Sequence, residues 1–357
     1  MTQNTFLLYG ANGYTGTLIA RFAAQYQLQP ILAGRTKDKI ETLATALELP
    51  YKVLDINDTK ELLAALRSVK LVVNAAGPFV FTADQMVKAC LQTGTHYIDI
   101  NGDIDVFEQI KSFDAAAKEA GIMLLPGAGF DVVPTDCLAL FLKTLLPDAN
   151  SLKLAFATLG GAISHGTAMS MLLKLGKGGA VRKEGKIVRL PLGQKSMTVD
   201  FGMKKIFVMS IPWGDVSTAY HTTAIPDIEA YTGIKPWIHR LLKFQYFFNP
   251  LLQTSLVRNY IAKKINSRPA GPTDAMREKA ISLVWGMAKN ANNQTVTARL
   301  RGPEGYTLTA IATLLIAQKV LDGNFTPGYQ TPAGKYGADL VMEIPGVTRE
   351  SVQQIGK

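Results

Sequence analysis

Apolar residues along the first 130 positions follow two alternating patterns. At helical spacing, apolar residues recur over Thr15–Gln25, Lys37–Leu47, Thr59–Ser68, Ala83–Thr93 and Asp105–Glu119. Between these segments lie short, continuously apolar runs, typical of strands covered on both faces: Thr5–Tyr9, Pro30–Ala33, Tyr51–Leu54, Leu71–Asn74, His96–Ile100 and Ile122–Leu125. Strands that alternate with helices of this length predict an α/β fold with a parallel, doubly wound sheet.

The pattern changes near residue 150. Strand-like segments joined by short loops are expected at Leu152–Thr158, Lys186–Leu192, Met197–Phe201, Lys205–Ile211, Ser217–Ala224, Ile281–Ala288 and Gln294–Leu300. Helical spacing occurs at His165–Leu175, Trp237–Phe247 and Tyr306–Leu321. We therefore expect a second, α+β domain with a mixed, largely antiparallel sheet over residues 131–304, which supplies the substrate pocket and the dimer contact.

The first predicted strand runs into a turn with three glycines and leaves it as a helix. The spacing is Gly-x-x-Gly-x-x-Gly. Glycines let the backbone turn tightly and approach a pyrophosphate, whose charge the free N–H groups of the helix N-terminus receive. This strand–turn–helix context predicts a dinucleotide-binding turn of Rossmann type, and the alternative is a glycine-rich turn that binds nothing. The predicted cofactor-binding residues here are Gly10, Ala11, Asn12, Gly13, Tyr14, Thr15 and Gly16.

Ligands of such sheets bind beyond the carboxyl ends of the strands. The second strand is followed by Arg35 and Thr36, with no acidic residue before Asp38. An Asp or Glu here would bind a ribose 2′-hydroxyl, whereas a guanidinium accommodates a 2′-phosphate. We therefore predict NADP(H) over NAD(H), unless Arg35 merely caps a surface loop. Asp55, after the third strand, is expected near the adenine or as a cap of the next helix.

The fourth strand ends in small residues that let a cofactor lie close to the chain. These are Ala75, Ala76, Gly77 and Pro78, and we include them in the predicted cofactor site. The fifth and sixth strands end in polar residues, which predict the reaction cleft. Asp131 follows the sixth strand and is expected either to face the nicotinamide or to cap the following helix.

Composition restricts the class of protein. Hydrophobic residues make up 47% and charged residues 18%, which is typical of a globular chain. Two cysteines, Cys90 and Cys137, are too few for a disulfide framework. We read no secretory signal, no run of about 18 apolar residues and no metal-ligand cluster. A cytoplasmic protein without a bound metal is expected.

The net charge of +10 is unevenly distributed. Residues 1–149 carry 12 Lys and Arg against 16 Asp and Glu, so the positive charge lies in the second half. Its basic residues are scattered and no nucleic-acid motif accompanies them, so we expect no nucleic-acid partner. Within this half, the segment 236–265 combines aromatic residues at helical spacing with His239, Arg240 and Lys243 before Pro250 breaks the run. Such a segment is expected to be core or subunit interface, a lid over an apolar pocket, or a peripheral membrane contact.

Reduction by a nicotinamide cofactor also needs a proton donor. The candidate catalytic residues are Asp131, His165 and His221, because an aspartic acid at the cleft or a histidine with an ordinary pKa near 6.5 can deliver a proton. Three further candidates are Tyr97, Asp136 and Tyr220.

Several segments, in order along nearly the whole chain, resemble the saccharopine dehydrogenase-like oxidoreductases, and particularly their trans-acting enoyl reductase branch. The matching segments include 9–16, 33–35, 74–79, 96–99, 129–136, 166–170, 213–218, 268–272, 305–309 and 331–333. The resemblance implies that Gly10–Gly16 and Arg35 bind NADP(H). It also implies that residues from about 305 to 357 pack back on the nucleotide-binding domain of residues 1–130.

By this resemblance the expected function is NADP(H)-dependent reduction of a C=O, C=C or C=N group in a small or lipid-like substrate. A homodimer is expected. A protein of another class stays open: a redox sensor or scaffold that binds NADP(H) without turnover and attaches to membranes through residues 236–265.

Overall fold

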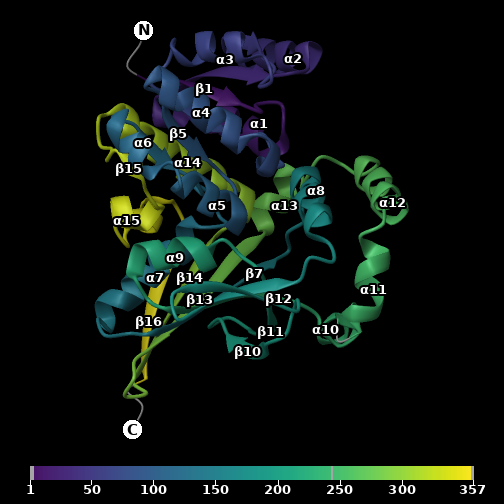
Figure 1. The fold of residues 1–357 in the computed structure, drawn as a ribbon, viewed down its shortest axis with the longest axis vertical. Helices are drawn as coiled ribbons and strands as arrows, with labels where there is room; N and C mark the ends of the chain where they lie inside the picture. Colours follow the sequence, from purple (N-terminus) through teal and green to yellow (C-terminus); the bar gives the residue numbers. More distant parts are fainter. Residues whose placement is uncertain (1–3, 243, 355–357) are drawn as a thin grey trace. The chain divides into compact units, whose positions relative to one another are not determined.

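The structure is a computed structural model that describes residues 4–242 and 244–354 (Figure 1). The chain divides into two compact units. One is formed by Met1–Val133 and Tyr306–Lys335, and the other by Pro134–Gly305 and Tyr336–Lys357.

The first unit contains a seven-stranded sheet in the order β15-β6-β5-β4-β1-β2-β3. Every neighbouring pair in it is parallel, which confirms the predicted doubly wound sheet. Its strands are β1 (Thr5–Tyr9), β2 (Gln29–Gly34), β3 (Tyr51–Val53), β4 (Leu71–Asn74), β5 (His96–Asp99), β6 (Met123–Leu125) and β15 (Gly328–Tyr329).

The order of the strands reverses at β1. The chain passes from β1 to β2 and β3 on one side and then returns to β4, which pairs with the other side of β1. This topological switch point between β1 and β4 is where open α/β sheets bind ligands. The central strands are largely apolar, with Leu7 and Val72 at 0% exposure in one buried cluster, as expected when helices cover both faces of a parallel sheet.

The helices of this unit follow the predicted pattern closely. They are α1 (Tyr14–Phe22), α2 (Lys37–Leu47), α3 (Thr59–Leu66), α4 (Ala83–Thr93), α5 (Ile104–Lys111), α6 (Asp114–Glu119), α14 (Gly305–Leu321) and α15 (Pro332–Tyr336), with short 3-10 turns η1 (Ala23–Tyr26) and η2 (Phe79–Phe81). The single helix predicted over Asp105–Glu119 is two helices. Helix α5 ends at its C-cap, Ser112. The Ser112 hydroxyl donates to the carbonyl oxygen of Gln109 at 2.6 Å, and this local hydrogen bond competes with continuation of the helix.

Helix α14 belongs to the nucleotide-binding unit although it comes late in the sequence. The Phe130 N–H donates to the Thr309 hydroxyl at 2.9 Å, and the Thr313 hydroxyl donates to the carbonyl oxygen of Ala128 at 3.2 Å. These bonds fix α14 beside the chain that leaves β6.

The second unit has a nine-stranded, mostly antiparallel sheet. Its main path is β10-β11-β12-β7-β13-β14-β16, and β8 pairs with β12 and β9. The strands are β7 (Ser151–Leu159), β8 (Gly179–Lys183), β9 (Lys186–Leu190), β10 (Ser196–Asp200), β11 (Lys205–Ser210), β12 (Asp227–Gly233), β13 (Ile281–Lys289), β14 (Thr295–Pro303) and β16 (Thr348–Gln354). The helices are α7 (Val133–Leu145), α8 (His165–Lys174), α9 (Asp215–Thr223), α10 (Pro236–Leu242), α11 (Gln245–Leu252), α12 (Ser255–Asn266), α13 (Asp274–Lys279) and the turn η3 (Leu340–Glu343).

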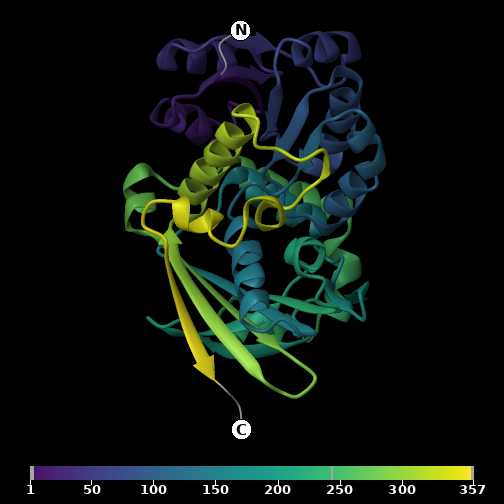
Figure 2. The ribbon, with the colours of Figure 1, turned by 90° about the vertical axis from the view of Figure 1, so that its left-hand side faces the viewer.

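The last segment of the chain differs from the sequence-based expectation. Residues from about 305 to 357 were expected to pack together on the nucleotide-binding domain, but residues 336–357 belong to the second unit. Figure 2 shows the yellow β16 beside the light green β14, with which it pairs antiparallel from Thr348 onward. The free edge of β14 supplies the hydrogen-bonding partners that hold this segment.

Two local predictions in the second unit were wrong. Ser217–Ala224 was expected to be a strand, but it lies in helix α9, where the hydroxyls of Thr218 and Thr223 donate to the carbonyl oxygens of Gly214 and Ala219 four residues earlier. Pro250 was expected to break a helix but lies inside α11. Its missing N–H removes one backbone hydrogen bond from this helix, which ends two residues later at Leu252. Lys243, in the predicted helix Trp237–Phe247, lies outside the described residues.

Candidate nucleotide-binding site

The turn after β1 has the geometry of a nucleotide-binding turn. Gly10 has a φ of +81°, which an L side chain adopts with strain. Its N–H donates to the carbonyl oxygen of Ala33 on β2 at 2.8 Å. Gly13 is the N-cap of α1, and the first turn of this helix carries no acidic side chain. The helix N-terminus therefore presents its N–H groups without a competing carboxylate.

Two of the three glycines are required by close contacts between backbones. A Cβ on Gly10 would lie 2.7 Å from the backbone nitrogen of Ala76 and 2.8 Å from the carbonyl carbon of Ala75. A Cβ on Gly16 would lie 2.3 Å from the carbonyl oxygen of Gly10. Gly10 thus joins the β1 and β4 ends at the switch point, and Gly16 lets α1 approach the turn.

The remaining residues of the turn face different surroundings. Asn12 is exposed, and its side-chain oxygen lies 2.7 Å from where a Cβ on Gly34 would stand, so the missing side chain of Gly34 makes room for it. Ala11 is buried and Thr15 is half-buried. The Tyr14 ring packs edge-on against Tyr306 of α14 at 5.0 Å, so α14 contacts the nucleotide-binding turn.

Arg35 and Thr36 stand at the adjacent strand end. Both are exposed directly after β2. Thr36 is the N-cap of α2, yet its side chain makes no capping hydrogen bond. A guanidinium and a hydroxyl that is not committed to its own helix are suitable donors for a phosphate.

Asp55 lies in the loop after β3. Its Oδ1 accepts the backbone N–H and the side-chain amide of Asn57, both at 2.9 Å. The cap of α3 is Asp58, so the alternative in which Asp55 caps that helix is wrong. Next to it, the N–H of Ile56 donates to the Tyr9 hydroxyl at 3.2 Å. Burial raises the pKa of Tyr9, with a smaller opposing effect of the Ile56 hydrogen bond.

The turn after β4 is held by a buried polar network. The Asn74 side-chain oxygen accepts the Ala76 N–H at 3.1 Å, and its amide donates to the Tyr97 hydroxyl at 3.3 Å. The Tyr97 hydroxyl in turn donates to Asp99 at 2.7 Å. The Asp99 carboxylate also accepts the N–H groups of Asn101 and Gly127. These bonds connect the ends of β4, β5 and β6 behind the Ala75–Pro78 turn, whose Gly77–Pro78 peptide bond is cis.

The sequence identifies the strands that carry this network, but it assigns no positioning role to Asn74, Tyr97 or Asp99. The signal that could have found it is a polar residue inside an otherwise apolar strand, as at Asn74. Asn74, Tyr97 and Asp99 are all fully buried. Burial raises the pKa of Tyr97 well above its usual value, and it also raises the pKa of Asp99, which the hydrogen bonds to Asn101 and Gly127 oppose.

The three candidate catalytic residues lie in different parts of the chain. Asp131 is in the nucleotide-binding unit, and its Oδ2 lies 2.5 Å from the position of a Cβ on Gly102, so its carboxyl packs against the chain that leaves β5. His165 begins α8 in the second unit, where its Nε2 lies 2.6 Å from the side-chain oxygen of Asn266. His221 is exposed on α9 of the same unit. Helix α8 packs against α12 and helix α9 against β12, so the two histidines occupy separate places.

The three further proton-donor candidates have structural partners. Tyr97 is buried in the network described above. The Asp136 carboxylate accepts the Thr222 hydroxyl at 2.6 Å. The Arg182 guanidinium lies over the Tyr220 ring, 4.2 Å from its centroid. Of these, Tyr97 and Asp136 are excluded as donors that touch substrate, because neither has exposed surface.

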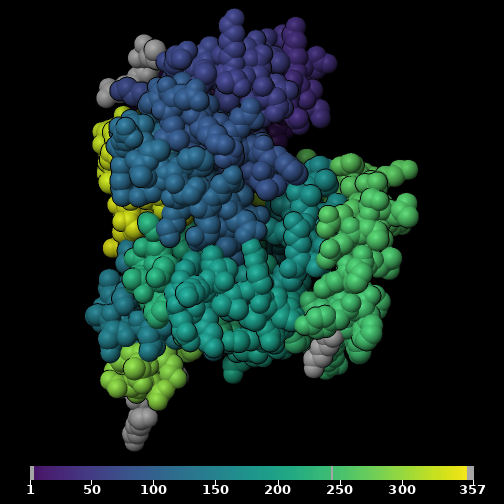
Figure 3. All heavy atoms as spheres, viewed as in Figure 1, coloured from purple at the N-terminus to yellow at the C-terminus, as the bar shows by residue number. Residues whose placement is uncertain are grey.

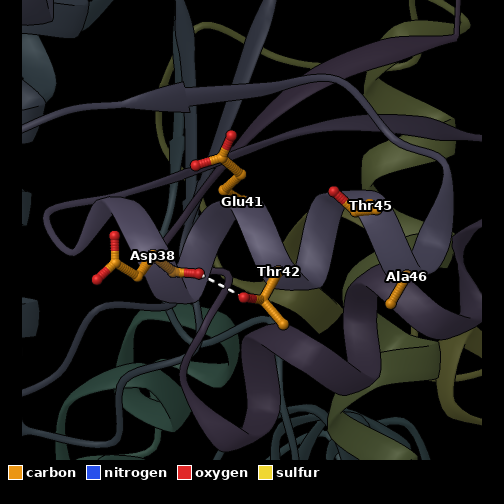
Figure 4. A pocket seen from close by; sticks show the side chains of 5 residues that line it. All are labelled: Asp38, Glu41, Thr42, Thr45 and Ala46. Atoms are coloured by element: carbon orange, nitrogen blue, oxygen red, sulfur yellow. Dashed lines mark hydrogen bonds between the residues drawn. The ribbon is translucent and has the colours of Figure 1, made fainter.

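A surface hollow of about 520 Å³ lies over α2 (Figure 4). It is lined by Asp38, Glu41, Thr42, Thr45 and Ala46. Figure 4 shows these side chains along a single helix, with the Thr42 hydroxyl donating to the Asp38 carbonyl oxygen. With two carboxylates and no residue of the predicted cofactor site, this hollow is a poor place for a phosphate.

Residues 4–242 and 244–354 contain no group of three or more His, Cys, Asp or Glu side chains placed to hold a metal ion. In the same part of the chain, no helix has both the length and the apolar character needed to cross a bilayer.

A parallel sheet with a glycine turn at its switch point defines a dinucleotide-binding unit of the kind found in oxidoreductases. Residues 6–125 match the family model of the saccharopine dehydrogenase NADP-binding domain. The chain thus carries an NADP-binding domain, and its first unit is similar to that of the saccharopine dehydrogenase-like oxidoreductases, the family that the sequence resembles.

Three curated proteins are similar to this chain. A human saccharopine dehydrogenase-like oxidoreductase is 24% identical over 400 residues, covering 90% of this chain and 91% of the relative. A lipid droplet localized protein of Caenorhabditis elegans is 30% identical over 216 residues, covering 53% and 51%. A trans-acting enoyl reductase of Mycobacterium leprae is 30% identical over 140 residues, covering 36% and 33%. The chain spans about half the length of several relatives that it matches: 47% of the saccharopine dehydrogenase-like oxidoreductases of Mus musculus and Rattus norvegicus, and 51% of the worm protein.

The fold also matches a solved structure. Apo saccharopine dehydrogenase (L-Glu forming) from Saccharomyces cerevisiae superimposes with a TM-score of 0.66 at 14% identity, covering 98% of this chain and 100% of that chain. This match confirms the predicted fold class, a Rossmann-type sheet followed by a domain with a mixed sheet.

Proposed function

We propose that this chain is an NADP(H)-dependent oxidoreductase that reduces a C=O, C=C or C=N group of a small or lipid-like substrate. The observation that carries the proposal is the edge of the parallel sheet where Gly10 contacts Ala76, α1 begins at Gly13 and Arg35 stands exposed. These three features supply close backbone approach, the positive end of a helix dipole and a cation for phosphate.

Each part of this edge has a proposed role. Gly10–Gly16 cradle the pyrophosphate, Arg35 and Thr36 bind the 2′-phosphate, and Asp55 lies near the adenine. Residues Ala75–Pro78 form the wall along the cofactor, held in place by Asn74. The residues fit the cofactor because the contacts that exclude a side chain at position 10 leave a backbone surface there.

The bound cofactor supplies a hydride, and the protein must position the acceptor and deliver a proton. We propose Asp131 as the donor, because it belongs to the unit that binds the cofactor and follows β6 at the carboxyl edge of the sheet. His165 and His221 are the alternatives in the second unit, which we propose supplies the substrate pocket. The homodimer, the cytoplasmic location and the enoyl reductase branch are further proposals that rest on the sequence.

The test is NADPH oxidation with a panel of ketones, enoyl thioesters and imines. Turnover of one class, abolished by a variant that cannot bind NADPH, would support the proposal and name the acceptor. Tight NADPH binding without turnover of any acceptor would instead favour the redox sensor or scaffold. That second candidate is favoured by one observation, the exposed apolar surface of α10–α12.

A further inference from the structure

Helices α10, α11 and α12 present large apolar side chains to solvent. Figure 3 shows this segment as green atoms at the molecular surface. Phe247 and Leu256 are 81% and 82% exposed. No described residue of α10 is buried, and in α11 and α12 the only ones that are buried are Gln245 and Ile265. The exposed residues form pairs one helical turn apart, Trp237 with Leu241, Phe247 with Leu251 and Leu256 with Tyr260. Each helix therefore has an apolar stripe that faces away from the protein.

The opposite side of these helices is attached through polar contacts. The Gln245 side chain exchanges two hydrogen bonds with the backbone of Leu192, at 3.0 and 2.9 Å. The Gln253 amide donates to the carbonyl oxygen of Gly176. A ring nitrogen of His239 lies 2.8 Å from the carbonyl oxygen of Gly193. A surface helix of a globular protein ordinarily turns its apolar stripe inward. Here each helix carries a further apolar stripe that faces outward, which leaves it open to a partner outside the chain.

The charges around the stripe identify its partner. No Asp or Glu occurs between Glu229 and Asp274. Over the same stretch the exposed charged side chains are all basic: Lys235, Arg240, Lys263, Lys264 and Arg268. A second copy of this chain, packed face to face, would bring these positive charges together. An anionic surface matches them.

We propose that α10–α12 dock the protein on an anionic phospholipid membrane. The aromatic and leucine side chains enter the boundary between headgroups and acyl chains, and the Lys and Arg side chains pair with lipid phosphates. A helix with an apolar stripe and a basic polar side lies in the plane of such an interface. This docking is independent of cofactor binding, which uses residues of the other unit.

The experiment is flotation of the full chain with vesicles of phosphatidylcholine alone and of phosphatidylcholine with phosphatidylglycerol. We expect binding to the anionic vesicles and none to the neutral ones, with a loss of binding at high salt. The double variant Lys263→Gln/Lys264→Gln should lower the affinity about 20-fold or more, since each basic residue near an anionic surface contributes roughly fivefold.

A second variant tests the apolar stripe. Phe247→Ser/Leu256→Ser should lower vesicle affinity about tenfold or more, whereas the control Met203→Ser, at a side chain 57% exposed elsewhere in the second unit, should not. NADPH binding and thermal unfolding of every variant should equal those of the wild type, which shows that both units fold. Equal binding to neutral vesicles, no flotation at all, or a dimer in sedimentation that Phe247→Ser/Leu256→Ser dissociates would each overturn the proposal.

Discussion

Gly10 and Ala76 meet backbone to backbone at the switch point of the parallel sheet. A Cβ on Gly10 would lie 2.7 Å from the Ala76 nitrogen, a distance that side-chain carbons do not reach without movement of the neighbouring backbone. This contact joins the first and fourth strand ends, and both ends belong to the proposed cofactor site. The shape of that site therefore depends on the absence of a side chain at position 10.

Gly10→Ala should weaken NADPH binding about tenfold or more. It should also lower the free energy of unfolding by more than roughly 1–2 kcal/mol, which is what a left-handed backbone alone costs an alanine. The control is Gly94→Ala, at a residue with φ +70° and nothing within 4 Å of its Cβ position. This control should lose only the free energy that a left-handed backbone costs an alanine, and it should keep its affinity for NADPH. Fluorescence titration and thermal unfolding measure both effects, and equal losses in the two variants would contradict the contact.

Tyr97→Phe tests the buried network behind the Ala75–Pro78 turn. The change removes the hydroxyl that donates to Asp99 and accepts from Asn74. We expect a loss of about 1–3 kcal/mol in unfolding free energy, because the buried carboxylate loses a donor, and a weaker affinity for NADPH. The control Tyr51→Phe, whose exposed hydroxyl donates to Glu41, should change little. A Tyr97→Phe protein with the stability and the NADPH affinity of the wild type would contradict the positioning role of this network.

His96 makes stability depend on pH. It is buried and accepts the Met123 N–H at Nδ1, and burial, followed by the charge of Lys70, lowers its pKa from 6.5 to about 4. The folded state thus keeps His96 neutral where the unfolded chain would protonate it. Its contribution to stability is complete above pH 6.5 and is lost as the pH falls toward 4.

Between pH 7 and pH 5 this histidine should remove about 2 kcal/mol of unfolding free energy. His96→Asn keeps an oxygen acceptor for Met123 and should lose that part of the pH dependence. Denaturant unfolding at the two pH values measures it, with His221→Asn as an exposed-histidine control. The same pH dependence in wild type and His96→Asn would contradict this assignment.

Asp131→Asn should lower kcat about 100-fold or more and leave NADPH affinity unchanged, because a general acid typically contributes 10²- to 10⁴-fold. Asp105→Asn, at an exposed carboxylate on α5 of the same unit, is the control and should keep its activity. Steady-state rates with the best acceptor from the substrate panel give the comparison. If Asp131→Asn retains kcat, the donor lies in the second unit and His165→Asn and His221→Asn become the decisive variants.

The nucleotide-binding half could be predicted in detail because its signals are local. Six of its seven strands were placed within about a residue, since all of these but β3 are short, largely buried runs, and Gly10, Gly13 and Gly16 follow directly from one of them. Arg35 was found in the same way, as the residue that immediately follows β2.

Features that depend on distant partners could not be predicted. Asp99 is held by the Gly127 N–H from another strand end, so its role is invisible in the segment His96–Asp99. Ser217–Ala224 contains β-branched residues that favour a strand, but its hydroxyls find carbonyl partners within a helix. For residues 236–265 the sequence left a core or interface, a lid and a membrane contact open. Helical spacing of apolar residues does not say which side of a helix faces the protein, so the outward stripe of α10–α12 could not be predicted.

The central claim, that this sheet edge selects NADP(H), rests most directly on Arg35. The decisive measurement is the pair of dissociation constants for NADPH and NADH, in the wild type and in Arg35→Gln, with Arg67→Gln as an exposed-arginine control on the same unit. The account predicts tighter binding of NADPH than NADH, and a selective loss of about 10- to 100-fold for NADPH in Arg35→Gln, as expected for a hydrogen-bonded charge pair. Equal affinity of the wild type for the two cofactors, or an Arg35→Gln protein that binds NADPH as well as the wild type does, would contradict it.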